Sequence, residues 1–128
     1  MNKERKIIFV RVKGGLGNQL FQYSMWRRLV NQYPNAQVKL DCSRLSGRKR
    51  SFDLKKLGFN PPIQNVSVFQ DRIAKYAKIL NLNGFNRWLK APILIQETNI
   101  NSFDAVCASI NQTKRCIIEG YWQKTHIH

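Results

Sequence analysis

The feature that most constrains the fold is a glycine-rich turn between an apolar run and an amphipathic one. The stretch KGGLGNQLFQY, residues 13–23, has glycine at positions 14, 15 and 17. Residues 6–12 before it are rich in Ile, Phe and Val with little alternation, which is typical of a strand buried on both faces of a parallel sheet. From 18 to 33 apolar residues recur four apart, which predicts a helix. The turn therefore joins a strand to a helix.

A second strand completes this unit. Residues 36–40, AQVKL, follow Pro34, and Asp41 closes them. A strand, a glycine turn, a helix and a strand within about 35 residues form a βαβ unit, whose two strands are parallel. The glycine turn then lies at the carboxyl end of the first strand. In open α/β sheets ligands bind at that end.

The rest of the chain continues the alternation of helices and strands. A loop and a short helical turn are expected before Gly58, and a helix over 71–82 with Ile73, Ala77 and Leu80 on one face and lysines outward. Further elements are expected at 92–96 (strand), 103–110 (helix) and 115–118 (strand). The fold class is therefore α/β, a Rossmann-like doubly wound parallel sheet, with residues 1–128 forming a single lobe.

The charge of the chain restricts its partners. Twenty-two Lys and Arg face seven acids, for a net charge of +15, and the densest basic block is 44–56. Such a block binds an acidic ligand, an anionic membrane surface or nucleic acid, or is simply a solvated loop. The sequence carries no nucleic-acid-binding motif, so nucleic acid is not an expected partner. Peripheral contact with an anionic membrane remains an expectation.

Cysteine and histidine spacing does not predict a metal site. Three cysteines, at 42, 107 and 116, are odd in number and are best explained as reduced, at least half-buried thiols. His126 and His128 have a metal-like spacing but no partner ligands. We therefore expect no metal.

The apolar run 7–10 is too short for a signal peptide or a membrane span, which favours a cytoplasmic location.

The glycine turn itself indicates an anion site. Glycines let the backbone approach a ligand, and a helix starting at Asn18 would direct N–H groups at a phosphate or pyrophosphate. One alternative is that the glycines only form a tight turn. Another is a dinucleotide site, because GLGNQL fits GxGxx and Asp41 stands near the ribose-binding distance. Leu20, in place of the third glycine, is expected to crowd the helix against the strand.

The other residues of this motif are informative as well as its glycines. The stretch GGLGNQLFQY resembles, residue for residue, the N-terminal motif of the alpha-1,2-fucosyltransferases of glycosyltransferase family 11. The segments IIFVRVKGGLGNQLFQYSMWRRL, VKLDCS and SFDLKKLGF are similar to that family's first strand and helix, second strand and following stretch. EGYWQ, residues 119–123, is similar to its later GY(F/W)Q element. Residues 60–110 match only in general character.

The resemblance implies the N-terminal lobe of a GT-B enzyme that moves L-fucose from GDP-fucose to the 2-hydroxyl of a galactose-terminated glycan. The reaction inverts the anomeric centre and needs no metal or other cofactor. The donor phosphate would bind at Gly14, Gly15, Gly17, Asn18 and Gln19, with the last two side chains reaching into the cleft. Asn18 can instead be a plain helix N-cap. The possible sugar contacts are Tyr121, Trp122 and Gln123, with aromatic core packing as the alternative.

One part of the family's pattern is missing. Its donor-binding HxRxGD element, which lies in the second half, has no counterpart here, and the sequence stops at KTHIH soon after GYWQ. We therefore expect a truncated chain that alone transfers fucose poorly or not at all, which an assay of GDP release with lactose tests. Asp41 and Glu119 are the candidate general bases, each with a turn or cap role as the alternative. The second hypothesis is a non-catalytic Rossmann-like nucleotide- or dinucleotide-binding module.

Overall fold

Helices and strands alternate along the chain. A computed structural model describes residues 5–45, 53–80, 92–97 and 102–122. Its elements, in order, are β1 (Ile7–Arg11), α1 (Leu16–Gln32), β2 (Gln37–Asp41), a 3₁₀ helix η1 (Asp53–Leu57), α2 (Val68–Ile79), β3 (Ile93–Gln96), α4 (Phe103–Asn111) and β4 (Arg115–Glu119). The predicted elements at the start and end of the chain are confirmed.

The four strands form one all-parallel sheet in the order β2-β1-β4-β3. β1 pairs with β2 so that Arg11 stands beside Asp41, at the carboxyl end of both strands. On its other side β1 pairs with β4. The predicted βαβ unit is therefore present, and the loops after β1 and β4 leave the sheet from its two central strands.

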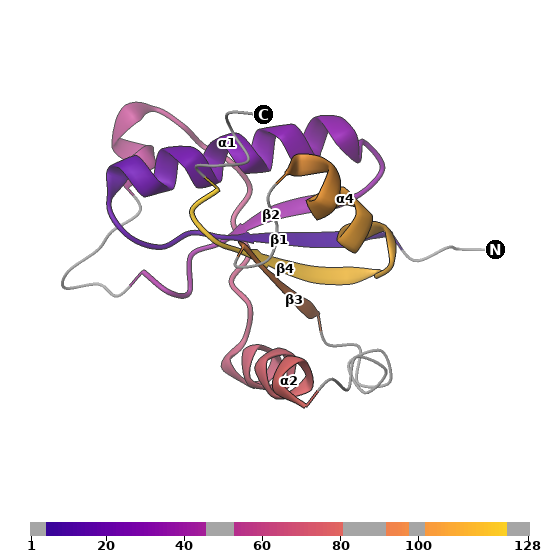
Figure 1. Ribbon diagram of the computed structural model, residues 1–128. Coiled ribbons are helices and arrows are strands. Elements are labelled where there is room, and N and C mark those ends of the chain that lie inside the picture. The colour runs from indigo at the N-terminus through magenta and orange to yellow at the C-terminus, as the bar shows by residue number, and fades with distance from the viewer. Residues whose placement is uncertain (1–4, 46–52, 81–91, 98–101, 123–128) are drawn as a thin grey trace.

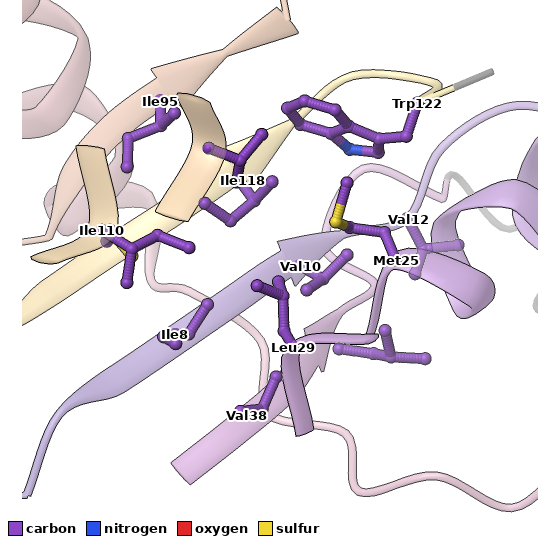
Figure 2. Packing of buried hydrophobic residues seen from close by; sticks show 13 residues of the cluster. Ile8, Val10, Val12, Met25, Leu29, Val38, Ile95, Ile110, Ile118 and Trp122 are labelled. Carbon is purple, nitrogen blue, oxygen red and sulfur yellow. The ribbon is translucent and has the colours of Figure 1, made fainter. Parts of the chain in front are cut away.

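Helices cover both faces of the sheet, as the doubly wound fold predicts: α1 and α4 lie on one face and α2 on the other (Figure 1). The larger core lies under α1 and α4, where Met25 and Leu29 of α1 meet Ile8 and Val10 of β1 (Figure 2). A smaller cluster lies under α2, formed by Phe9, Val66, Ala74, Leu94 and Ile117. The Rossmann-like α/β class is confirmed, and the GT-B assignment stays a prediction.

Helix α1 begins earlier than predicted. It starts at Leu16, and Gly15 is its N-cap, with no side-chain capping hydrogen bond. The prediction that the helix starts at Asn18 is therefore wrong, since Asn18 lies within the first turn. The physical reason is that glycine is itself an acceptable N-cap, so the helix can begin before Asn18, the first residue with a capping side chain.

Helix α2 also differs from its prediction. It spans Val68–Ile79, not 71–82, because the Ser67 hydroxyl accepts a hydrogen bond from the Gln70 N–H and so starts the helix at Val68. The predicted inward position of Leu80 is wrong, since 61% of its surface is exposed. The side chains that face the sheet are Ala74 and Ala77.

All three cysteines are free, with Cys116 buried and the other two half-buried, as predicted. Burial raises the pKa of Cys42 to about 11 and that of Cys116 to about 12. These thiols are therefore protonated near neutral pH and are poor nucleophiles.

In the part of the chain that the structure covers, none of the helices has the length and apolar character needed to cross a membrane.

Candidate functional site

The glycine turn lies at the carboxyl end of β1 and leads directly into α1. Gly14 has a φ of +84°, in the left-handed region, and Gly15 is extended. No acidic residue lies in the first turn of α1. The first N–H groups of a helix have no carbonyl acceptor within the helix, and the helix dipole is positive there. The turn therefore presents the features of an anion site, and the first turn of α1 adds no carboxylate to oppose one.

Gly17 has open space around it. A Cβ built on Gly17 would meet no other atom within 4 Å, and the residue is exposed. By contrast, a Cβ on Gly14 would lie 2.8 Å from the Asn18 amide nitrogen, so Asn18 packs against the turn. The first glycine is thus required by the fold, whereas the bare Cα of Gly17 leaves room for something outside it.

Two buried glutamines of α1 hold this turn in place. Gln19 donates to the Gly14 carbonyl at 3.0 Å and accepts from the Asp53 N–H of η1 at 3.0 Å. Gln22 accepts from the Lys13 N–H and donates to the Gly120 carbonyl, both at 3.0 Å. Both side chains are fully buried. The glycine turn is therefore fixed to β4's exit and to η1 by side chains three residues apart.

The structure corrects two expectations about this segment. The side chain of Gln19 does not reach outward toward a ligand but points into the protein, because two backbone groups engage it. Leu20 does not crowd the helix against the strand, since 39% of its surface is exposed. The argument against a dinucleotide site from Leu20 therefore fails.

The second motif forms a tight turn directly after β4. Glu97 accepts hydrogen bonds from the N–H groups of Tyr121, at 3.3 Å, and Trp122, at 2.6 Å. Trp122 has a φ of 63°, and a Cβ on Gly120 would lie only 2.6 Å from the Glu97 Cβ. Gly120 is therefore needed for the close approach of Glu97, which in turn holds Trp122 in its left-handed conformation.

The predicted sugar-contact residues separate in the structure. Trp122 is 1% exposed and packs in the core beside Met25 and Ile118, so core packing is the role that the structure shows for it (Figure 2). Tyr121 is 41% exposed, and the Lys13 ammonium lies 5.2 Å from its ring centroid. Gln123, like His126 and His128, lies outside the described residues.

A buried arginine forms ion pairs with three acidic side chains at this edge of the sheet. Arg11, fully enclosed, donates from Nε to Asp41 at 3.1 Å. Its two terminal nitrogens reach Glu119 at 2.5 Å and Asp71, in the first turn of α2, at 2.8 Å. Burial alone would lower the pKa of Arg11, and the contacts with Glu119, Asp71 and Asp41 outweigh it and raise the pKa. Arg11 is therefore a permanent cation that links three strands to α2.

The two candidate bases occupy unequal positions in this cluster. Asp41 is fully buried, and besides Arg11 its carboxylate accepts from the N–H groups of Ser43 and Val66, each at 3.1 Å. The Glu119 side chain keeps 15% exposure. Burial would raise the pKa of Glu119, but hydrogen bonds from Gln96 and Arg11 outweigh it, so the pKa lies below its usual range. Glu119 is thus the more accessible carboxylate, and ionised at neutral pH.

A basic hollow lies beside this cluster, next to the first half of α2. Its volume is about 260 Å³, and its lining residues are Ser43, Arg44, Val66, Val68, Asp71, Arg72 and Lys75. Arg44 pairs with Asp71 at 2.5 Å, and Lys75 lies 3.7 Å from the same carboxylate. Three cations and one acid line it, so the hollow favours anions.

Sequence reasoning missed the residues that organise the site: Arg11, Lys13, Gln22 and Glu97. For Gln22 a signal was available, because Gln19, Gln22, Met25 and Leu29 share one face of the helix and the last two are apolar. A polar pair on a core-facing stripe indicates buried hydrogen bonds. Arg11 at the end of an apolar strand, paired with Asp41 at the end of the next, was a similar signal.

Within residues 5–45, 53–80, 92–97 and 102–122 the side chains of His, Cys, Asp and Glu form no group of three or more that could hold a metal. The fold and this edge define a Rossmann-like α/β protein with a glycine turn at the carboxyl end of its first strand. Comparisons of the chain with models of protein families, with curated proteins and with solved structures found no match.

Proposed function

We propose that the chain is the glycine-turn lobe of a glycosyltransferase that moves L-fucose from GDP-fucose to the 2-hydroxyl of a galactose. One contact supports this most directly. Gln22, in the first segment that resembles the fucosyltransferases, donates to the Gly120 carbonyl, in the second, 98 positions away. The two segments meet at the edge of the sheet where α/β proteins bind their ligands. Their joint resemblance is therefore matched by a physical connection.

In this proposal the donor diphosphate lies against the first turn of α1. The leaving GDP gains negative charge in the transition state, and preorganised N–H donors with a positive helix end stabilise such charge. Gly17 leaves room for a phosphate to approach the backbone. Lys13, half-buried beside the turn, supplies a positive charge for the donor diphosphate. Tyr121, which is partly exposed, is the aromatic contact for a sugar ring.

Of the two candidate bases, the proposal retains Glu119. A base must reach the acceptor hydroxyl, and the enclosed carboxylate of Asp41 cannot. The same enclosure disfavours a dinucleotide site, in which the acid after the second strand binds a ribose hydroxyl. Glu119 would act from within its hydrogen bonds to Arg11 and Gln96.

Binding to the full chain tests the proposal. GDP-fucose is expected to raise the melting temperature, and NAD is not. Gly17→Ala is expected to weaken GDP-fucose binding about tenfold, because the added methyl blocks the approach to the first turn of α1. Lys13→Gln is expected to weaken it as well, whereas Lys114→Gln, which removes the same charge from an exposed position before β4, leaves the affinity unchanged.

Two outcomes would count against the proposal. Stabilisation by NAD alone would favour the dinucleotide-binding module. Equal GDP-fucose affinity in the wild type and Gly17→Ala, measured by titration calorimetry, would show that the glycine turn is not the donor site.

A further inference from the structure

Helix α2 presents the reverse of the usual amphipathic arrangement. Its residues that pack on the sheet are small, Ala74 at 1% and Ala77 at 3% exposure. Ile73 is half-buried, but the other large apolar residues of the helix and its C-cap point outward, with the following exposed fractions: Val68 68%, Phe69 69%, Tyr76 63%, Ile79 76% and Leu80 61%. A surface helix normally turns such residues to the core. We call these five residues the outer face of α2.

Cations accompany this face. Arg72, Lys75 and Lys78 lie on the same helix, and the basic hollow, which Val68 helps to line, adds Arg44 beside them. Within α2, all of whose residues the structure describes, the only acid is Asp71, and its carboxylate is already engaged by Arg11, Arg44 and Lys75. The apolar outer face is therefore accompanied by positive charges.

We propose that the outer face of α2 docks the protein on an anionic lipid bilayer, with the helix lying parallel to the membrane plane. Phe69, Tyr76 and the aliphatic residues enter the boundary between headgroups and acyl chains. Arg72, one turn from Val68 and Tyr76, keeps its stem beside the apolar residues while its charged end reaches the lipid phosphates, and the exposed Lys78 reaches them from the flank of the helix. Anionic headgroups attract such cations, and the net charge of +15 adds a long-range contribution.

The charge of the face favours a bilayer over another protein. Among the residues that the structure describes, α2 is the only helix on its side of the sheet, so no other described helix covers its outer face (Figure 1). A second copy of the chain would bring the cations of one α2 against those of the other, which opposes association of two strongly basic molecules. An anionic bilayer meets the apolar and the charged requirement at once.

Vesicle sedimentation with the full chain tests the proposal. We expect binding to phosphatidylcholine vesicles that contain phosphatidylglycerol, and little binding to phosphatidylcholine alone. The double variant Phe69→Gln/Tyr76→Gln removes apolar contacts, and Arg72→Gln/Lys78→Gln removes two charges. Each is expected to weaken binding at least about tenfold. The first variant loses the buried apolar area on which interfacial binding depends. The second loses two cations, each of which changes the affinity for an anionic surface by about a factor of five. All four residues are exposed, and thermal unfolding verifies that both variants fold.

The matched control is Arg27→Gln/Lys114→Gln, which removes two exposed charges outside α2. It is expected to weaken binding clearly less than Arg72→Gln/Lys78→Gln. Equal loss in the two charge variants would overturn the proposal, since binding would then follow net charge alone. Absence of binding to anionic vesicles, or equal binding to both kinds of vesicle, would also overturn it. So would a dimer in solution that Phe69→Gln/Tyr76→Gln dissociates, because the face would then join two copies of the chain.

Discussion

Two glycines of the same turn meet opposite requirements. Gly14 has a left-handed φ of +84° and lies against Asn18. Gly17 has neither a positive φ nor a neighbour within 4 Å of its Cβ position. Side chains are excluded at the first position by backbone strain and by contact, and at the second by nothing inside the protein. The fold therefore requires glycine at position 14, whereas the proposed ligand requires it at position 17.

Gly14→Ala is expected to lower the free energy of unfolding by about 1–3 kcal/mol, the usual cost of strained backbone combined with a steric contact. Gly17→Ala is expected to change it by about 0.5 kcal/mol or less, or to stabilise slightly, since alanine favours helix. Urea unfolding of the two variants measures the difference. If Gly17→Ala destabilised as much as Gly14→Ala, the distinction between the two positions would be wrong.

The glycine turn could be predicted from the sequence, but the roles of its neighbours could not. Glycine between an apolar run and a helical pattern is a local signal. Gln19 was expected to face a ligand because its motif resembles a donor-binding loop, yet its side chain is hydrogen-bonded to two backbone groups that the sequence does not display. Trp122 packs inward because Glu97 fixes the turn before it, and that contact spans 25 positions.

At the scale of elements, α1 connects the two loops of the candidate site. Its buried face carries Gln19 and Gln22 before the apolar Met25 and Leu29. The N-terminal half of the helix therefore binds loops by hydrogen bonds, and the C-terminal half binds the sheet by apolar packing.

Gln22→Leu is expected to destabilise the protein by about 1–3 kcal/mol for each of the two backbone groups that lose their partner, the Lys13 N–H and the Gly120 carbonyl. The matched control is Gln32→Leu, the same change at an exposed position at the end of α1. Its effect is expected to be within about 0.5 kcal/mol. Urea unfolding tests both, and similar losses in the two variants would contradict the bracing role of Gln22.

Helix α2 shows where element prediction succeeds and where it stops. The periodic pattern predicted a helix in this region, and the structure has one. Of the predicted inner face, Ala77 is buried and Ile73 is half-buried, but Leu80 is exposed, because the pattern assumed that a large apolar residue at helical spacing is buried. Alanines at 74 and 77 let the helix lie close to the sheet, and the larger residues are left outside.

At the scale of the whole molecule, Arg11 joins elements that no local pattern connects. Its guanidinium contacts acids at the ends of β2 and β4 and in α2, while Arg11 itself ends β1. The parallel sheet could be predicted because each strand can be recognised from the pattern of a few consecutive residues. The charge cluster could not, because it depends on contacts up to 108 positions apart.

This cluster makes stability depend on pH through Glu119. Its pKa is lowered in the folded protein, so the folded state binds the proton less readily than the unfolded state does. Glu119 therefore contributes stability that is fully present above the unfolded pKa of about 4.3 and is lost as the pH falls through the lower, folded pKa. Glu119→Gln is expected to destabilise the protein at pH 7, and its deficit to shrink as the pH falls below about 4.

Urea unfolding of the wild type and Glu119→Gln from pH 7 to pH 3 measures this change. Gln96→Leu supplies the matched test, because it keeps Arg11 and Glu119 but removes one hydrogen bond that lowers the pKa of Glu119. The acid loss of stability is then expected to be smaller than in the wild type and to be complete at a higher pH, because the folded pKa lies closer to the unfolded one. A deficit of Glu119→Gln that stays constant across this range would mean that the charge of Glu119 does not stabilise the fold. Arg11 would then hold the sheet edge together through Asp41 and Asp71 alone.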